Sequence, residues 1–157
     1  MWYWITGIGI TLSVFAFMEF VAWSLHKYVM HGFLWFVHKD HHNKTPGFFE
    51  RNDFFFLIFA IPSWLFIMFG IMDGADWKMW VGIGITLYGI AYFTVHEVII
   101  HQRFKFLKNV TNLYFAGLRK AHRVHHKKLG KEDGECFGML LVPRKYFEEA
   151  KRALHNK

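Results

Sequence analysis

Residues 79–101 read MWVGIGITLYGIAYFTVHEVIIH, an apolar run that ends in two histidines five positions apart. The apolar part is long enough to cross the ~30 Å hydrocarbon core of a bilayer as a helix. The ending is one residue longer than the zinc-protease signature H-E-x-x-H, whose two histidines leave one helical face and bind one zinc. A spacing of five turns the rings of His96 and His101 about 140° apart on an ideal helix. Either the two rings serve different metals, or the helix is distorted, or one histidine is not a ligand.

Two further segments have transmembrane length, residues 1–25 and residues 54–72. The first contains Glu19, whose charge is costly in lipid, so we expect it to face the bundle interior, where a role as a hydrogen-bonded packing partner is favoured over a direct functional role. The second contains Pro62, which should kink the helix, as a membrane bundle tolerates. A polar turn at 73–78 separates the second segment from the third. Three spans in a chain of this length predict an all-α integral membrane helical bundle, with residues 1–157 as a single domain.

The chain after the third apolar segment is mostly polar and basic. Residues 112–118, NLYFAGL, are too short to cross a membrane alone and could lie in the interface or contribute a weak fourth membrane segment. We expect a cationic helix over 118–129, a loop over 130–134, and a closing helix over 143–154 that begins at Pro143. These short elements would form a cap beside the membrane spans.

Lysine and arginine are distributed unevenly between the two sides of this bundle. The segment 26–53 carries four, the turn 73–78 carries one, and residues 101–157 carry fourteen. Because cytoplasmic loops are enriched in Lys and Arg, the first and last of these segments should be cytoplasmic. The net charge of +7 and the 54% hydrophobic content fit a membrane protein with a basic aqueous face. Such a face could attract anionic lipid headgroups or steer an acidic protein partner.

Ten of the eleven histidines fall into four groups in a repeated order. The order is H-x4-H, H-x2-H-H, H-x4-H and H-x2-H-H, with members His26, His31, His38, His41, His42, His96, His101, His122, His125 and His126. His155 stands outside the pattern and is interpreted as a solvated surface residue. The single cysteine, Cys136, excludes an internal disulfide and a cysteine-rich metal site.

The spacing of the ten histidines predicts a dinuclear metal centre. Positions i, i+3 and i+4 of an H-x2-H-H motif lie on one helical face, so two such helices could offer six imidazoles to one cavity. Both H-x4-H pairs follow the ends of spans that share a membrane side, which brings all four groups to the cytoplasmic cap. Ten imidazoles exceed the needs of one ion and suit two ions with about five nitrogens each. Imidazole binds iron, zinc, copper and nickel, so the ligand type does not select the metal.

Three carboxylates near these motifs, Glu50, Asp53 and Glu97, could orient imidazoles through their second ring nitrogens. For Asp53, capping of the following helix, a role it could share with Asn52, is an equally open alternative. Glu97 is not expected to be the general base of a protease, because the other H-x4-H motif, HKYVMH, has Lys27 at the position that Glu97 occupies in HEVIIH.

The motifs as a set resemble those of the bacterial β-carotene 3-hydroxylases, small members of the membrane fatty acid hydroxylase superfamily. The resemblance lies in the order of the histidine groups and in their contexts: WSLHKYVMHG, FFERND, VHEVIIHQR, AHRVHH and CFGMLL. It extends over nearly the whole chain. Glu97 stands where the family pattern has an aspartate, and Cys136-Phe-Gly-Met139 replaces Ser-Phe-Gly-Phe.

This resemblance implies an O2-dependent monooxygenase whose ten motif histidines hold two non-haem iron ions. The enzyme would hydroxylate carbon 3 of the β-ionone rings of β-carotene to give β-cryptoxanthin and zeaxanthin. It would take the carotenoid from the bilayer and electrons from an external ferredoxin and ferredoxin reductase. The expected location is the bacterial inner membrane, with the metal site on the cytoplasmic side and no nucleic-acid partner.

Two other functions stay open at this point. A fatty acyl or sterol hydroxylase or desaturase of the same superfamily would use the same histidine pattern. A membrane metal transporter or sensor is less favoured, because the histidines cluster on one side of the membrane and do not line a path across it.

Overall fold

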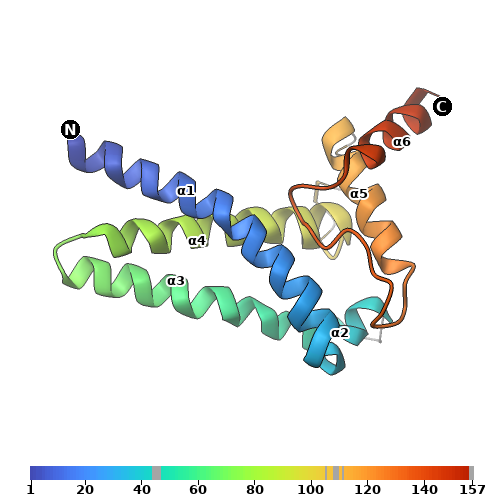
Figure 1. Ribbon diagram of the computed structural model, residues 1–157, viewed down its shortest axis with the longest axis horizontal. Coiled ribbons are helices and arrows are strands. Elements are labelled where there is room, and N and C mark those ends of the chain that lie inside the picture. The colour runs from blue at the N-terminus through green and yellow to red at the C-terminus, as the bar shows by residue number, and fades with distance from the viewer. Residues whose placement is uncertain (44–46, 105, 108–109, 111, 156–157) are drawn as a thin grey trace. The chain divides into compact units, whose positions relative to one another are not determined.

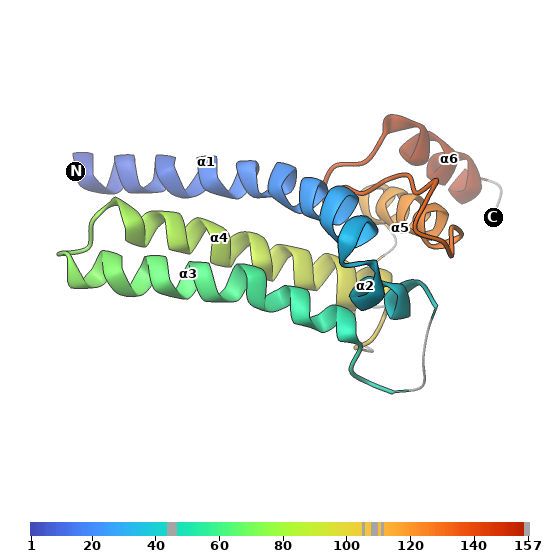
Figure 2. The same ribbon diagram turned by 60° about the horizontal axis from the view of Figure 1, so that its bottom comes forward.

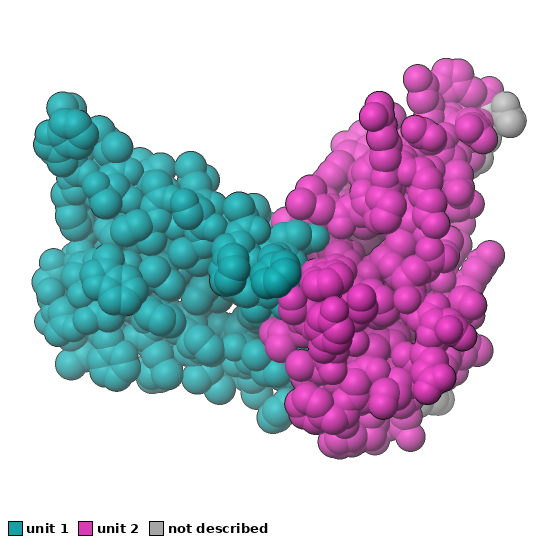
Figure 3. Space-filling model, in the orientation of Figure 1, with its two compact units in different colours: residues 1–21, 53–91 teal, residues 22–52, 92–157 magenta. Residues whose placement is uncertain are grey.

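The computed structural model describes residues 1–43, 47–104, 106–107, 110 and 112–155, and all regular secondary structure in these residues is helical. The chain forms two compact units (Figure 3). Unit 1 consists of Met1–Val21 and Asp53–Ala91, and unit 2 consists of Ala22–Asn52 and Tyr92–Lys157. The all-α prediction is confirmed.

Unit 1 is built from the apolar helices. They are α1 (Trp2–Ser24, of which the first part belongs to unit 1), α3 (Phe55–Met72) and α4 (Trp77–Phe93). The helices α3 and α4 run side by side and are joined by a short turn (Figure 1, Figure 2). Within the described residues, three helical stretches are long and apolar enough to cross a membrane: Trp2–Phe33, Arg51–Met72 and Trp77–Ile100. This confirms the three predicted spans, and α3 continues without a break past Pro62.

Small and polar side chains let these helices approach closely. A Cβ atom on Gly84 would lie 2.8 Å from Cβ of Val14, so α1 and α4 meet where glycine exposes the backbone. The Thr11 hydroxyl donates to the Trp80 carbonyl at 3.2 Å. Glu19 is buried and accepts a hydrogen bond from the Tyr88 hydroxyl at 2.7 Å, which confirms its predicted place in the interior of the bundle.

The outer surface of unit 1 is apolar. Large side chains such as Trp64, Phe56 and Ile90 are exposed to 60%, 60% and 58%. An apolar surface of this extent is costly in water and costs nothing in a hydrocarbon medium. The exposure pattern therefore supports a membrane location for these helices.

Unit 2 contains the shorter elements of the chain. In chain order they are the π-helix η1 (Leu25–Phe33), α2 (Trp35–His42), the start of the 3-10 helix η2 (Arg51–Phe54), the π-helix η3 (Thr94–Ile100), α5 (Leu113–His126) and α6 (Arg144–His155). The helices α5 and α6 pack together, with the ring of Phe147 against Gly117 and stacked 6.1 Å from that of Tyr114. Val95, Leu118 and Met139 form a buried apolar cluster in this unit.

The C-terminal predictions agree with this arrangement in most respects. The predicted helices 118–129 and 143–154 correspond to α5 and α6, and residues 130–134 form a loop. The segment 112–118 is the beginning of α5, where the Asn112 side chain accepts from the Phe115 amide at 3.0 Å and caps the helix. It is not among the candidate spans of the described residues, so the possible fourth membrane segment is not found there.

Candidate metal centre

The first H-x4-H pair lies within the π-helix η1, and the second begins in the π-helix η3 and ends at its C-cap residue, His101, which explains the unusual spacing. A π-helix is closed by hydrogen bonds between residues five apart, so a five-residue spacing amounts to one turn. The His101 amide donates to the His96 carbonyl at 2.9 Å, a bond of this type between the two histidines themselves. The paired rings are close, with centroids 4.5 Å apart for His96 and His101 and 5.3 Å for His26 and His31. Of the three alternatives for HEVIIH, the distorted helix is correct.

Five buried histidines from η1, α2 and α5 converge in what we call group one. One ring nitrogen of each lies within 4.8 Å of the corresponding nitrogens of all the others, and the members are His26, His31, His38, His42 and His125. Both histidines of the first H-x4-H pair therefore face the same point.

Four further histidines from α2, η3 and α5 form group two by the same distance criterion: His41, His96, His101 and His122. His126 lies beside this group, with its ring centroid 4.4 Å from that of His122 and 4.9 Å from that of His101, and it also stacks on His42 at 4.6 Å. Its buried Nε2 atom has no hydrogen-bond partner in the described part of the chain. His126 is thus placed to supply a fifth nitrogen to group two.

Each H-x2-H-H motif is shared between the two groups. On α2, His38 and His42 are one helical turn apart and face group one, whereas His41 faces group two. On α5, His125 faces group one and His122 faces group two. His155 is exposed at the end of α6, as expected for a surface residue.

In group one, every Nδ1 atom lies within hydrogen-bond distance of an oxygen that can only accept. The partners are Phe137 O for His26 (3.0 Å), Lys131 O for His31 (3.1 Å), Asn52 Oδ1 for His38 (2.6 Å), Lys128 O for His42 (3.0 Å) and Glu135 O for His125 (2.9 Å). In a neutral imidazole one nitrogen carries the proton and the other carries a lone pair. Each Nδ1 is therefore the donor, and five Nε2 lone pairs point into group one.

These lone pairs are too close together to be stable without a cation. Nε2 of His31 is 3.2 Å from Nε2 of His42 and 3.3 Å from Nε2 of His125. Protonation would relieve the repulsion, but burial, reinforced by the neighbouring imidazoles, lowers the pKa of His42 to about 4 and that of His125 to about 3. At neutral pH these imidazoles therefore stay unprotonated, and a proton does not relieve the repulsion between their lone pairs. A bound metal ion would relieve it, so the arrangement fits a metal site.

Two imidazoles of group two have carboxylate partners, whereas the partners in group one are neutral oxygens. Nδ1 of His41 donates to Glu50 at 2.8 Å, and Nδ1 of His96 donates to Glu97 at 2.6 Å. Arg103 forms ion pairs with both carboxylates, at 3.3 Å to Glu50 and 3.1 Å to Glu97. Again the Nε2 atoms face each other, 3.2 Å apart for His41 and His96 and 2.8 Å apart for His101 and His122.

The contacts of Glu50 and Glu97 are those expected of residues that orient imidazoles. Asp53 is the third residue predicted for this role. The side chain that accepts from His38 belongs to its neighbour Asn52, so the role of Asp53 stays a prediction. Sequence reasoning missed Asn52 and Arg103 in these roles, although both stand in the motif contexts FFERND and VHEVIIHQR. It also missed the backbone carbonyls of 128–137, which have no sequence signature.

A cavity of about 410 Å³ adjoins group two. It is lined by Ile100, His101, Gln102, Arg119, His122, Arg123 and His126. Three of these residues are histidines of the centre, so the cavity borders the imidazoles of group two.

Comparison with known proteins finds a family and relatives that cover most of the chain. The family model described as fatty acid hydroxylase matches residues 11–143, which include all ten motif histidines. The Beta-carotene hydroxylase of Pantoea ananas is 40% identical over 141 residues, which cover 89% of this chain and 79% of that protein. The Beta-carotene hydroxylase of Paracoccus sp. (strain PC1) is 36% identical over 142 residues, or 88% and 85% of the two chains. No solved structure gives a significant match.

Proposed function

This chain belongs to the fatty acid hydroxylase family, and from that premise we propose that it is a di-iron monooxygenase that hydroxylates β-carotene. The product would be β-cryptoxanthin and then zeaxanthin, by hydroxylation at carbon 3 of each β-ionone ring. The observation that carries the proposal is the convergence of unprotonated imidazole nitrogens in two buried groups. The choice of substrate is supported by the bacterial relatives named Beta-carotene hydroxylase.

The ten motif histidines would hold the two irons, five for each. Group one supplies His26, His31, His38, His42 and His125, and group two supplies His41, His96, His101 and His122 together with the neighbouring His126. When bound, the two irons would activate O2 for the replacement of a C–H bond by a C–OH group. Iron itself is proposed from the family, because imidazole also binds zinc, copper and nickel.

The residues of the chain would keep the ligands ready for the metal. In the described residues, oxygens of backbone carbonyls, of the Asn52 amide and of two carboxylates accept from Nδ1 of seven of the ten imidazoles, which leaves Nε2 of these rings free to coordinate. Burial keeps the imidazoles of α2 and α5 neutral, since it lowers the pKa of His41 and His122 well below the ordinary value. A C–H bond has no acidic proton to remove, so this chemistry needs no acid–base dyad.

Substrate and electrons would reach the centre by different routes. A carotenoid is long and apolar and dissolves in the bilayer in which we place the three spans. We propose a bacterial inner-membrane location with the metal centre on the cytoplasmic side, following the fourteen Lys and Arg residues of 101–157. The same positive charge would steer an acidic, ferredoxin-type electron donor toward this side.

Expression in cells that accumulate β-carotene tests the proposal. Chromatography of the pigments should show β-cryptoxanthin and zeaxanthin with the natural chain and only β-carotene with His101→Ala. Pigment that remains β-carotene while added fatty acids or sterols gain hydroxyl groups would instead favour a fatty acyl or sterol hydroxylase.

A further inference from the structure

One short segment of the chain orients most of group one. The segment 128–137, which we call the carbonyl strap, accepts from four of the five Nδ1 atoms through the backbone oxygens of Lys128, Lys131, Glu135 and Phe137. The four imidazoles stand on three different elements, η1, α2 and α5. The strap is therefore the feature that gives ligands from separate helices a common orientation.

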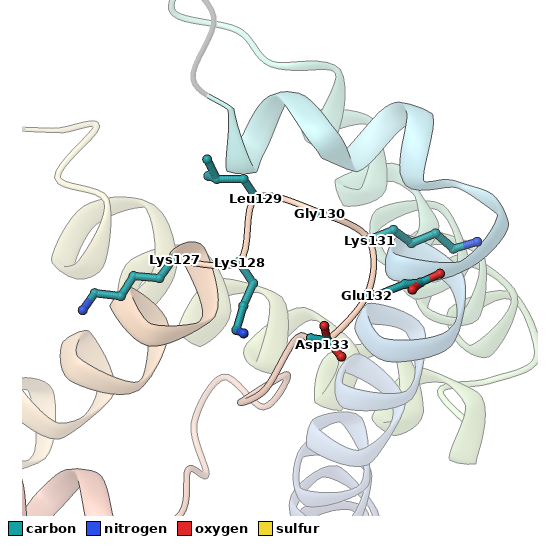
Figure 4. A pocket seen from close by; sticks show the side chains of 7 residues that line it. All are labelled: Lys127, Lys128, Leu129, Gly130, Lys131, Glu132 and Asp133. Carbon is teal, nitrogen blue, oxygen red and sulfur yellow. The ribbon is translucent and has the colours of Figure 1, made fainter.

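The strap has no helix or strand of its own. Its residues form bends and irregular backbone, so the carbonyls are free to accept from imidazoles. Residues 128–133, the first part of the strap, are exposed, and together with Lys127 they line an open pocket of about 630 Å³ (Figure 4). Asp133 and Cys136 have φ angles of 59° and 62°, a left-handed conformation that is unfavourable for residues other than glycine. Contacts outside the strap must hold it in this shape.

One such contact comes from the first turn of α6, in addition to the Asn43 amide that donates to the Leu129 oxygen and the rings that pack on Phe137. The Tyr146 hydroxyl donates to Oε2 of Glu135 at 2.9 Å, and Lys145 pairs with the same oxygen at 3.1 Å. Tyr146 is 2% exposed and belongs to the face of α6 that is buried in unit 2, whereas the Lys145 side chain is 56% exposed. An exposed ion pair contributes little, so the buried hydroxyl is the stronger anchor. The backbone oxygen of Glu135 is itself the acceptor for His125.

We propose that Tyr146 and Glu135 are positioning residues of the metal centre, and that their hydrogen bond holds the carbonyl strap against the imidazoles of group one. This inference rests on the proposed metal-binding function of the ten histidines. It has a selective consequence, because His41 and His96 of group two take their orientation from Glu50 and Glu97 and not from the strap. Loss of the anchor should weaken one metal site and spare the other.

Cobalt(II) titration of the purified, metal-stripped full chain in detergent tests the inference, with visible absorption as the readout of ligand geometry. The natural chain should bind two ions per chain. Tyr146→Phe, which keeps the buried ring, should bind one ion as before and the second at least about tenfold more weakly, as is typical when a group that orients a ligand is lost. Glu135→Ala should behave in the same way, and because the Glu135 side chain is 45% exposed its truncation leaves no buried cavity.

Two further variants serve as controls. Glu135→Gln keeps an oxygen that can accept from Tyr146 and should restore binding close to that of the natural chain. Glu148→Gln removes a partner of the exposed pair with Arg144 on the same helix and should change neither site. A titration in which Tyr146→Phe and Glu135→Ala bind both ions normally, or lose both equally, would overturn the inference. A natural chain that binds fewer than two ions would instead refute the dinuclear centre itself.

Discussion

The hydrogen bond between Glu97 and His96 separates two interpretations of HEVIIH, a metal-ligand motif and a catalytic acid–base motif. Replacement of Glu97 by Gln keeps the size of the side chain and an oxygen that can accept from Nδ1 of His96, which lies 2.6 Å from the carboxylate in the natural chain. It removes the negative charge and with it the ion pair to Arg103, which retains Glu50 as a partner. The variant therefore changes the charge behind one imidazole and leaves all ten rings in place.

The expected loss is modest. A hydrogen bond to a charged group contributes about 1.5–3 kcal/mol and a neutral one about 0.5–1.5 kcal/mol, a difference of about 1 kcal/mol. Since 1.4 kcal/mol corresponds to a factor of ten, metal affinity at group two should fall about five- to tenfold. This lies near the lower end of the 10–100-fold range for residues that orient metal ligands. His101→Ala, in contrast, removes a ring nitrogen from group two and should abolish hydroxylation and lower the metal content.

The assay is a paired measurement of bound metal and hydroxylated carotenoid on both variants from the same preparation. Partial activity with Glu97→Gln and none with His101→Ala would agree with metal-ligand chemistry. If His101→Ala kept full metal and full activity while Glu97→Gln was inactive, Glu97 would be the reacting group and the metal-ligand interpretation of HEVIIH would be wrong.

Three further predictions concern metal content, acid sensitivity and the membrane helices. The purified protein should carry about two metal ions per chain without haem, with zinc able to replace iron; elemental analysis showing one ion, with both H-x2-H-H motifs dispensable, would contradict this. The metal-stripped protein should lose stability as the pH falls from about 6.5 toward 4, because burial lowers the pKa of His42 to about 4 and the unfolded chain therefore binds more protons than the folded chain. Denaturant unfolding at several pH values measures this loss, and a free energy of unfolding that does not change with pH would argue against neutral buried imidazoles. Tyr88→Phe removes the hydroxyl that donates to buried Glu19 and should lower the free energy of unfolding by about 1–3 kcal/mol; unfolding in detergent would show no difference if that bond were unimportant.

Several features of this protein follow from local sequence alone. The three spans depend only on the length and apolar composition of their segments, which any helix of that composition would share. The H-x2-H-H motifs put their histidines on one helical face because neighbours three and four apart always lie there. Glu50 and Glu97 are close to their imidazoles along the chain, at separations of nine and one, so nearness in sequence made them recognisable.

The sequence pattern did not predict which type of helix carries the H-x4-H pairs. The spacing of five excluded an undistorted helix with both rings on one ion, but it allowed two metals, a widened turn, or one histidine that is not a ligand. The backbone bond from His101 to His96 decides for the widened turn. Such a turn is unfavourable by itself and is retained because the packed imidazoles of other elements surround it.

The division of the histidines between two groups was decided only by the tertiary structure. Spacing gives the face of a helix, but which face meets which other helix depends on contacts between residues far apart in the chain. His31 and His125 are 94 positions apart and their Nε2 atoms are 3.3 Å apart. The carbonyl strap is the clearest case, because every residue has the same backbone oxygen and no side chain marks the four that accept from imidazoles. The sequence therefore determined which histidines are available, and the folded chain decided which nitrogen of a ring carries the lone pair and where it points.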